Sequence, residues 1–335
     1  TRPQSLNIDG IRCDDPVTIA NTFNDYFINC AKEVTENLTR DTAIPDHGDI
    51  CLVDNEFTLK PISMEYVKKV ISDMNTNKAA GDDYISCRLL KITLPAILDS
   101  LTMVINRSLT TGYVPSGMKT AKVTPLFKAG DPLEVGNYRP ISILSTVSKI
   151  IERAVFDQLF EFLVDNQLLH PNQSGFRPQH STLTILTKLV THWSQNIDAG
   201  LLTVAFIDLR KAFDTIDHSI LLAKLKSLGC CTSALNWFTS FLSRRSQRVC
   251  INKAFSTPQN VISGVPQGSI LGPLLFSIYV NSMPSSVSTG IVDMYADDTT
   301  LTVTGTSGTD VEQNLNCALG EISQWLNVNR LDKEL

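Results

Sequence analysis

The stretch MYADDTTLTV, residues 294–303, sets two adjacent aspartates, Asp297 and Asp298, between two runs of strand-forming residues. The flanking runs IVDMY and TTLTV predict two short strands joined at the acidic pair, which makes a β-hairpin. Adjacent carboxylates repel each other, so their place at a hairpin tip needs a reason. Either they form an ordinary solvated turn, where Asp is common, or they hold a cation that offsets the repulsion.

A third carboxylate favours the cation. Residues 201–208, LLTVAFID, are a near-continuous apolar run, which predicts a strand buried on both faces and ending in Asp208. A charge at the end of an apolar strand needs a partner. If this strand end lies beside the hairpin tip, the three carboxylates offer the oxygen ligands that Mg²⁺ prefers. Two such ions, roughly 3.5–4 Å apart, activate an attacking hydroxyl and neutralise a leaving phosphate.

Two further segments are candidates for ligand contacts. In SGVPQGSILGPLLF, residues 263–276, the Gly and Pro residues predict a tight loop before a helix, with Gln267 projecting its amide from that loop. In the turn-rich segment 125–142, Lys128 and Arg139 are placed to clamp a polyphosphate. Taken alone, the first segment supports no more than a loop before a helix, and the second favours ordinary solvated surface charge.

Composition places the chain among globular proteins with a substantial core. It has 335 residues, of which 43% are hydrophobic and 19% charged. No apolar run approaches the length needed to span a membrane, so no membrane is expected. The eight cysteines and five histidines form no CxxC or H-x₃-H pattern. This argues against a zinc site or a disulfide framework and favours an intracellular protein, with nucleus or cytoplasm left open.

Charge is distributed unevenly along the chain, whose net charge is −5. Residues 1–101 carry 10 basic and 16 acidic side chains, whereas residues 102–335 carry 19 basic and 18 acidic ones. Three of those 18 acids are the aspartates described above. If they face cations, the rest of the second region is basic enough for a groove that holds nucleic acid.

Helices and strands are expected in an irregular order, which favours the α+β class. Asp15 as a cap and Pro16 as the first helical residue mark the start of the first helix. Residues 40–58 are polar and broken, as in a linker. Apolar spacing predicts further helices, and the expected ranges are 63–74, 95–111, 146–166, 181–199, 233–243, 269–283 and 310–329, with one more ending at Gly229. Residues 113–144 read as short strands and turns, and 247–252 as a strand.

The order and spacing of five motifs closely resemble the reverse transcriptase of non-LTR (LINE-type) retrotransposons, most of all the jockey-like group. The motifs are NYRPIS (137–142), QSGFRP (173–178), FIDLRKAFD (206–214), GVPQGSILGPLLF (264–276) and YADDT (295–299). The resemblance runs from about residue 16 to residue 331. It implies the fingers and palm of a right-hand polymerase, with an antiparallel palm sheet backed by helices. Residues 1–58 would be an N-terminal helix and linker, 59–199 fingers-like, and 200–335 palm-like, ending before the thumb.

The resemblance also implies roles for the acidic residues. Asp208 and Asp297 match the main ligands of two Mg²⁺ ions, or of Mn²⁺ in their place, and Asp298 matches a supporting carboxylate. Tyr295 and Ala296 match residues that line the primer end.

Four other residues match positions that hold the incoming nucleotide. Phe213 matches an aromatic wall that rejects a 2′-OH, although a core role fits it equally well. Gln267 matches a glutamine that touches the nucleotide, and Lys128 and Arg139 match fingers residues that hold its triphosphate.

The implied activity is that of an RNA-directed DNA polymerase from a mobile element, with an RNA template, a DNA primer and dNTPs as partners. Nothing in the sequence resembles the endonuclease domain of such proteins. The segment WLNVNRL (325–331) continues as DKEL, so the lysine expected to protonate pyrophosphate and the thumb beyond it are not found; Lys333 lies outside that context. The sequence begins with TRPQSLN and not with Met, so we expect it to be a piece of a longer parent protein. Two alternatives stay open, an inactive relic that at most binds nucleic acid and a metal-dependent nuclease.

Overall fold

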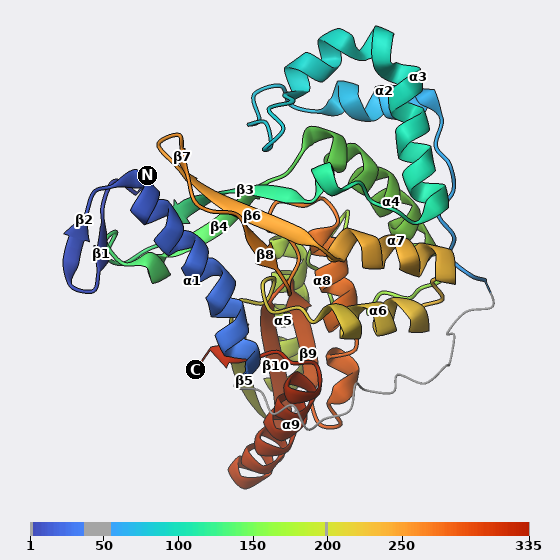
Figure 1. Cartoon of the computed structure of the whole chain (residues 1–335). Helices are drawn as coiled ribbons and strands as arrows, with labels where there is room; N and C mark the ends of the chain where they lie inside the picture. The colour runs from blue at the N-terminus through green and yellow to red at the C-terminus, as the bar shows by residue number, and fades with distance from the viewer. Residues whose placement is uncertain (1–2, 37–54, 198–199, 335) are drawn as a thin grey trace.

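A computed structural model describes residues 3–36, 55–197 and 200–334, and its helices and strands alternate irregularly, as the α+β prediction requires (Figure 1). Two sheets organise the described chain, one of four strands and one of five, besides a small hairpin of β1 (Leu6–Ile8) and β2 (Ile11–Cys13).

The four-stranded sheet is antiparallel throughout and has the order β11-β5-β10-β9. Its strands are β5 (Leu201–Leu209), β9 (Ile291–Tyr295), β10 (Asp298–Gly305) and β11 (Lys333–Glu334). The predicted hairpin is confirmed, because β9 and β10 are its two arms.

One face of this sheet packs into the main core, and the other face is partly open. Leu301 and Val303 of β10 are buried with apolar side chains of α9 (Gly308–Val328), which contacts β10 and β5. On the opposite face, α5 (Thr182–Ile197) covers part of the sheet and leaves Phe206 75% exposed. The prediction that residues 201–208 form a strand buried on both faces is therefore wrong. Alternate side chains of β5 point to a face that α5 does not fully cover.

The five-stranded sheet joins distant parts of the sequence. Its strands are β3 (Thr120–Phe127), β4 (Tyr138–Ile143), β6 (Arg245–Ile251), β7 (Ala254–Phe255) and β8 (Gln259–Val261). The order is β4-β3-β6-β7, with β8 also pairing with β6, and the β3–β6 pair is parallel. Helix α1 (Pro16–Glu36) lies against this sheet (Figure 1) and buries Ile19 and Phe23 in a second, smaller core.

The remaining helices surround these sheets. They are α2 (Met64–Asp73), α3 (Cys87–Thr111), α4 (Thr146–Asp165), α6 (His218–Ser227), α7 (Thr232–Leu242) and α8 (Gly272–Val280), with short 3₁₀ turns at Ser116–Met118, Val135–Asn137 and Pro284–Ser286. Every predicted helix is present. The predicted cap of α1 is confirmed too, since Asp15 accepts a hydrogen bond from the Thr18 N–H at 2.8 Å. Most of the predicted linker, residues 40–54 of 40–58, lies outside the described residues.

Helix α3 differs most from its prediction. It begins at Cys87 rather than near Pro95, because the Ser86 side chain caps it by accepting from the Leu89 N–H at 3.1 Å. It ends at Gly112 as predicted, with φ +67°. By length and composition alone α3 could cross a membrane, so the expectation that no apolar stretch is long enough was wrong. A single such helix is weak support for a span, and α3 contributes Ile105 and Leu109 to the main core.

Candidate active site

The tip of the β9–β10 hairpin is a tight two-residue turn. Tyr295 pairs with Asp298, which leaves Ala296 and Asp297 as the central residues. Ala296 has φ +59°, whereas Asp297 does not have a positive φ. A positive φ at the first central position is typical of type II′ turns, which usually place Gly there. An alanine in this conformation is strained and persists only where its surroundings hold it.

A loop over residues 170–180, called here the bracing loop, holds that turn. The Gln173 side chain is 1% exposed, and its Oε1 accepts from the Ala296 N–H at 3.1 Å while its Nε2 donates to the Ala296 carbonyl at 3.3 Å. Ser174 donates its N–H to the Met294 carbonyl at 2.9 Å. Gly175 lies so close that a Cβ there would be 2.1 Å from the Ala296 nitrogen. The tip is therefore clamped by side chain and backbone together.

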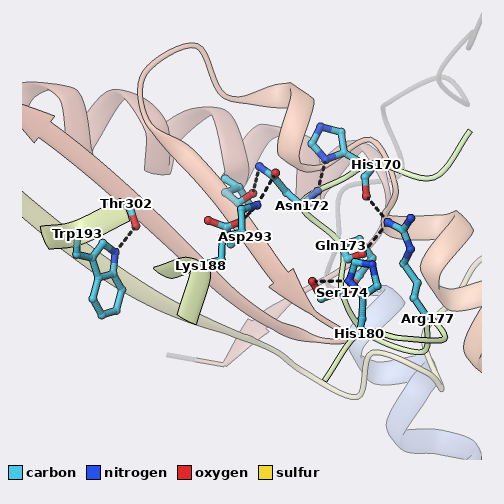
Figure 2. A network of polar contacts seen from close by, with 11 residues as sticks. His170, Asn172, Gln173, Ser174, Arg177, His180, Lys188, Trp193, Asp293 and Thr302 are labelled. Carbon is cyan, nitrogen blue, oxygen red and sulfur yellow. Dashed lines mark hydrogen bonds and ion pairs between the residues drawn. The ribbon is translucent and has the colours of Figure 1, made fainter. Parts of the chain in front are cut away.

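Helix α5 fixes the two strands of the hairpin further from the tip, as Figure 2 shows. Lys188 donates to the buried Asp293 carboxylate at 2.6 Å and to the Asn172 side-chain oxygen at 2.8 Å. Trp193 donates its indole N–H to the Thr302 hydroxyl at 2.9 Å. These contacts tie β9, β10 and the bracing loop to one helix, which makes the acidic tip a rigid feature of the fold.

The structure brings Asp208 to this tip. The β5–β10 register pairs Ile207 with Thr299, so the next position places Asp208 across from Asp298. Both side chains line one cavity of about 600 Å³ between α5 and the sheet, together with Tyr295. Figure 1 shows β5 and β10 side by side in the same sheet. Asp208 and the Asp297–Asp298 pair, about ninety positions apart in sequence, thus lie at one end of one sheet.

The three acids influence one another electrostatically. Burial raises the pKa of Asp297 above its ordinary value of 3.8, and the like charges of Asp298 and Asp208 raise it further. The guanidinium of Arg139, from the other sheet, acts in the opposite direction on the same carboxyl. A bound cation would relieve the same repulsion.

The donor chemistry fits a hard cation, although the side chains do not enclose one. Within the described residues, no group of three or more His, Cys, Asp or Glu side chains is placed to hold a metal ion unaided. Mg²⁺ sites seldom need such an enclosure, because one or two carboxylates act with water and substrate phosphates. The all-oxygen set and the raised pKa of Asp297 match that kind of open site.

Phe213 packs between the main core and the bracing loop. Its ring stacks on Phe276 with centroids 4.7 Å apart, which ties it to the main core. Its other neighbour is Phe176 of the bracing loop, edge-on at 5.9 Å, and that ring is 44% exposed. Phe213 itself is half-buried, so part of its ring stays open to solvent.

Gln267 sits in the tight loop that the sequence predicts before α8. Gly264 and Gly268 have φ angles of +77° and +125°, which glycine adopts without strain because it has no Cβ. The Gln267 carbonyl accepts from the Ser142 N–H at 2.8 Å, and its side-chain Nε2 donates to Asp214 at 2.8 Å. The amide is thus held on the side of the loop that faces the segment after β5.

Lys128 and Arg139 belong to the β3–β4 hairpin. Arg139 pairs with Leu126, and the Lys128 N–H donates to the Asn137 carbonyl at 2.8 Å, which continues the ladder. In this register Lys128 and Arg139 are diagonal neighbours on one face. Both are exposed. The positive charge of Arg139 lowers the pKa of Asp297.

Comparison with known proteins decides the family. Residues 126–333 match the family described as "Reverse transcriptase (RNA-dependent DNA polymerase)". The chain belongs to the reverse transcriptase family. This reverse transcriptase domain is 32% identical over 276 residues to "RNA-directed DNA polymerase from mobile element jockey" of Drosophila melanogaster, covering 80% of the chain and 30% of that protein. The predicted likeness to non-LTR, jockey-like elements is therefore confirmed.

Two further relatives agree. The domain is 30% identical over 276 residues to "Probable RNA-directed DNA polymerase from transposon BS" of Drosophila melanogaster, covering 80% of the chain and 30% of the relative. It is 30% identical over 279 residues to "Probable RNA-directed DNA polymerase from transposon X-element" of the same species, covering 81% and 30%. The chain spans about 30% of the length of these relatives.

Several residues of the site were not predicted from the sequence. Gln173, Gly175 and Asp214 were noted only as parts of the QSGFRP and FIDLRKAFD motifs, and Lys188 and Asp293 were given no role. Their contacts join positions far apart in the chain, so no local pattern indicates them. A weak signal existed for Asp293, a lone acid inside the apolar strand IVDMY, which needs a partner when buried.

Proposed function

We propose that this chain is the fingers and palm portion of an RNA-directed DNA polymerase that adds dNTPs to a primer 3′-OH on an RNA template. The observation that carries the proposal is the meeting of Asp208 with the braced Asp297–Asp298 tip, in a chain of the reverse transcriptase family. The relatives named above are RNA-directed DNA polymerases of mobile elements.

The acidic residues act as the cation site in this proposal. Asp208 and Asp297 hold two Mg²⁺ ions, or Mn²⁺ in their place, and Asp298 supports them. The bound ions supply activation of the primer hydroxyl and neutralisation of charge on the phosphates. The rigid hairpin contributes position, because reacting groups must be held near their attack geometry for the rate to rise.

The remaining residues hold the nucleotide. Arg139 and Lys128 lie on one face of the β3–β4 hairpin and contact the triphosphate. Phe213 forms the wall under the sugar and excludes a 2′-OH by contact, and Gln267 touches the nucleotide from its loop. Tyr295 and Ala296 line the primer end. The support for Arg139 is its electrostatic reach to Asp297, which places a cation opposite the acids.

The division of the chain into an N-terminal region, fingers and palm is part of the same proposal. Residues 1–58 are an N-terminal helix and linker, 59–199 the fingers and 200–335 the palm, although β3 and β6 join the last two regions in one sheet. Endonuclease and thumb regions belong to a longer parent protein, in keeping with the 30% of the relatives' length that is covered. We propose an intracellular location, because the irregular spacing of the cysteines in the sequence favours reduced, structural thiols over a disulfide framework.

Two measurements test the function without requiring a thumb. The first is Mg²⁺-dependent binding of a fluorescent dNTP, and the second is extension of a DNA primer on an RNA template. We expect Asp208→Asn to reduce extension at least ~10²-fold, because it removes a charge that the transition state needs. The matched control is Asp99→Asn, an exposed carboxylate on α3, which should leave both signals unchanged.

The same assays separate the alternatives. A folded chain without divalent-dependent dNTP binding would support the inactive relic. Degradation of nucleic acid in the absence of dNTP, lost in Asp208→Asn, would support the nuclease. Either result would contradict the polymerase proposal.

A further inference from the structure

The loop that carries Gln267 is locked to the segment that carries Phe213. The Gly264 N–H donates to the Ile216 carbonyl at 2.8 Å, and the Val265 N–H donates to the Phe213 carbonyl at 2.9 Å. A Cβ on Gly264 would lie 2.6 Å from the Asp214 carbonyl oxygen, so the two backbones touch. The aromatic ring and the amide are therefore carried by one rigid unit.

Asp214 is the side chain that orients the Gln267 amide within this unit. Its Oδ2 accepts from Gln267 Nε2 at 2.8 Å, and both residues line a small cavity of about 50 Å³ together with Ser142. An ionised carboxylate only accepts hydrogen bonds, so the amide must turn its NH₂ toward Asp214. One N–H and the carbonyl oxygen of Gln267 are then left for other contacts.

The backbone of Gln267 does not depend on Asp214. Its carbonyl is held by the Ser142 N–H, and the following turn is capped by the buried Glu152 carboxylate, which accepts from the Ser269 hydroxyl at 2.5 Å and the Ile270 N–H at 2.8 Å. Loss of the Asp214 carboxylate would therefore release the amide while leaving the loop in place.

We propose that Asp214 is a positioning residue for nucleotide selection: it fixes the Gln267 amide beside Phe213, so that the sugar of the incoming nucleotide meets both at once. The proposal rests on the proposed polymerase function. Asp214 itself does not touch the nucleotide, and its effect passes through Gln267.

The burial of Asp214 also predicts how its substitution affects the stability of the protein. Desolvation raises the pKa of Asp214 to about 6, while the hydrogen bond from Gln267 and the charge of Lys211 oppose the rise. The folded state therefore disfavours the ionised form at neutral pH relative to the unfolded chain. Asp214→Asn removes that charge and keeps the shape, so its Tm should equal or exceed that of the wild type.

The test is a double-mutant cycle on dNTP affinity. Asn at 214 both donates and accepts, so it no longer dictates which way the Gln267 amide faces. We expect Asp214→Asn to weaken dNTP binding and raise KM roughly 10-fold, as for the loss of one charge-assisted hydrogen bond, with a smaller change in kcat and poorer rejection of ribonucleotides. In a Gln267→Ala background, Asp214→Asn should add almost nothing.

The control is Asp217→Asn, three residues along the chain. Asp217 caps α6 and pairs with Arg330, and Asn preserves the cap, so dNTP affinity should not change. Equal effects of Asp214→Asn with and without Gln267 would overturn the positioning role while leaving the polymerase function standing. If the wild-type chain binds no dNTP in the presence of Mg²⁺, the polymerase function and this inference both fall.

Discussion

Gly175→Ala should displace the acidic tip without touching any acidic residue. A Cβ at position 175 would lie 2.1 Å from the Ala296 nitrogen and 2.6 Å from its Cα. Ordinary contact begins near 3.4 Å, so the two backbones must separate by about 1.3 Å. Backbone atoms cannot rotate away as a flexible side chain can, and the hydrogen bonds between Gln173 and Ala296 must lengthen.

Both stability and activity follow from that displacement. Overpacking in a filled site typically costs about 1–3 kcal/mol. A shift of about 1 Å in a catalytic group can cost ~10²-fold in rate. We therefore expect Gly175→Ala to remain folded, with a lower denaturant midpoint, and to lose about two orders of magnitude in primer extension.

The assay pairs denaturant unfolding with primer extension on the same preparations. Gly320→Ala is the control, because nothing lies within 4 Å of a Cβ there and Gly320 is inside α9. It should stabilise the protein by about 0.5–1 kcal/mol and leave extension unchanged. Wild-type extension by Gly175→Ala would refute the idea that the bracing loop fixes the hairpin.

Three further predictions concern the acidic tip, its brace and the proposed nucleotide site. Lys188→Met leaves the buried Asp293 carboxylate unpaired and should lower the free energy of unfolding, measured with denaturant, by about 1–3 kcal/mol. The double variant Lys188→Met with Asp293→Asn should recover most of that stability, and no recovery would disprove the pairing. Because burial and like charges raise the pKa of Asp297, the folded state binds its proton more readily than the unfolded chain, so stability falls as pH rises from 3.8 through the raised pKa. Asp297→Asn should thus have a higher Tm than the wild type at pH 7 while losing extension, and a lower Tm would contradict this sign. Phe213→Val should raise ribonucleotide incorporation, and unchanged discrimination would remove Phe213 from the nucleotide site.

Helix ends that depend on a few adjacent residues were predicted correctly. Asp15 and Gly112 mark helix ends because capping and left-handed conformations depend on a few adjacent residues. The start of α3 was missed because Pro95 suggests a helix start, whereas the helix tolerates Pro95 within it.

Features that depend on contacts between distant segments could not be predicted from local sequence. The apolar composition of 201–208 suggested burial on both faces. Phe206 is nevertheless exposed, because α5 covers only part of that face of the sheet. The three acids were predicted to meet from the motif pattern. The loop that braces them was not, because Gln173 acts on Ala296 across 123 positions of sequence.

The most direct test of the cation site is cleavage of the polypeptide by hydroxyl radicals generated at a bound metal. Fe²⁺ replaces Mg²⁺ at oxygen-rich sites, and added hydrogen peroxide, reduced by the bound Fe²⁺, gives hydroxyl radicals that cut the nearest backbone. Two groups of cuts are expected, one near Asp208 and one at residues 295–298; both should be suppressed by excess Mg²⁺ and lost in Asp208→Asn. Cuts confined to one of these segments, or cuts that persist in Asp208→Asn, would contradict a shared site.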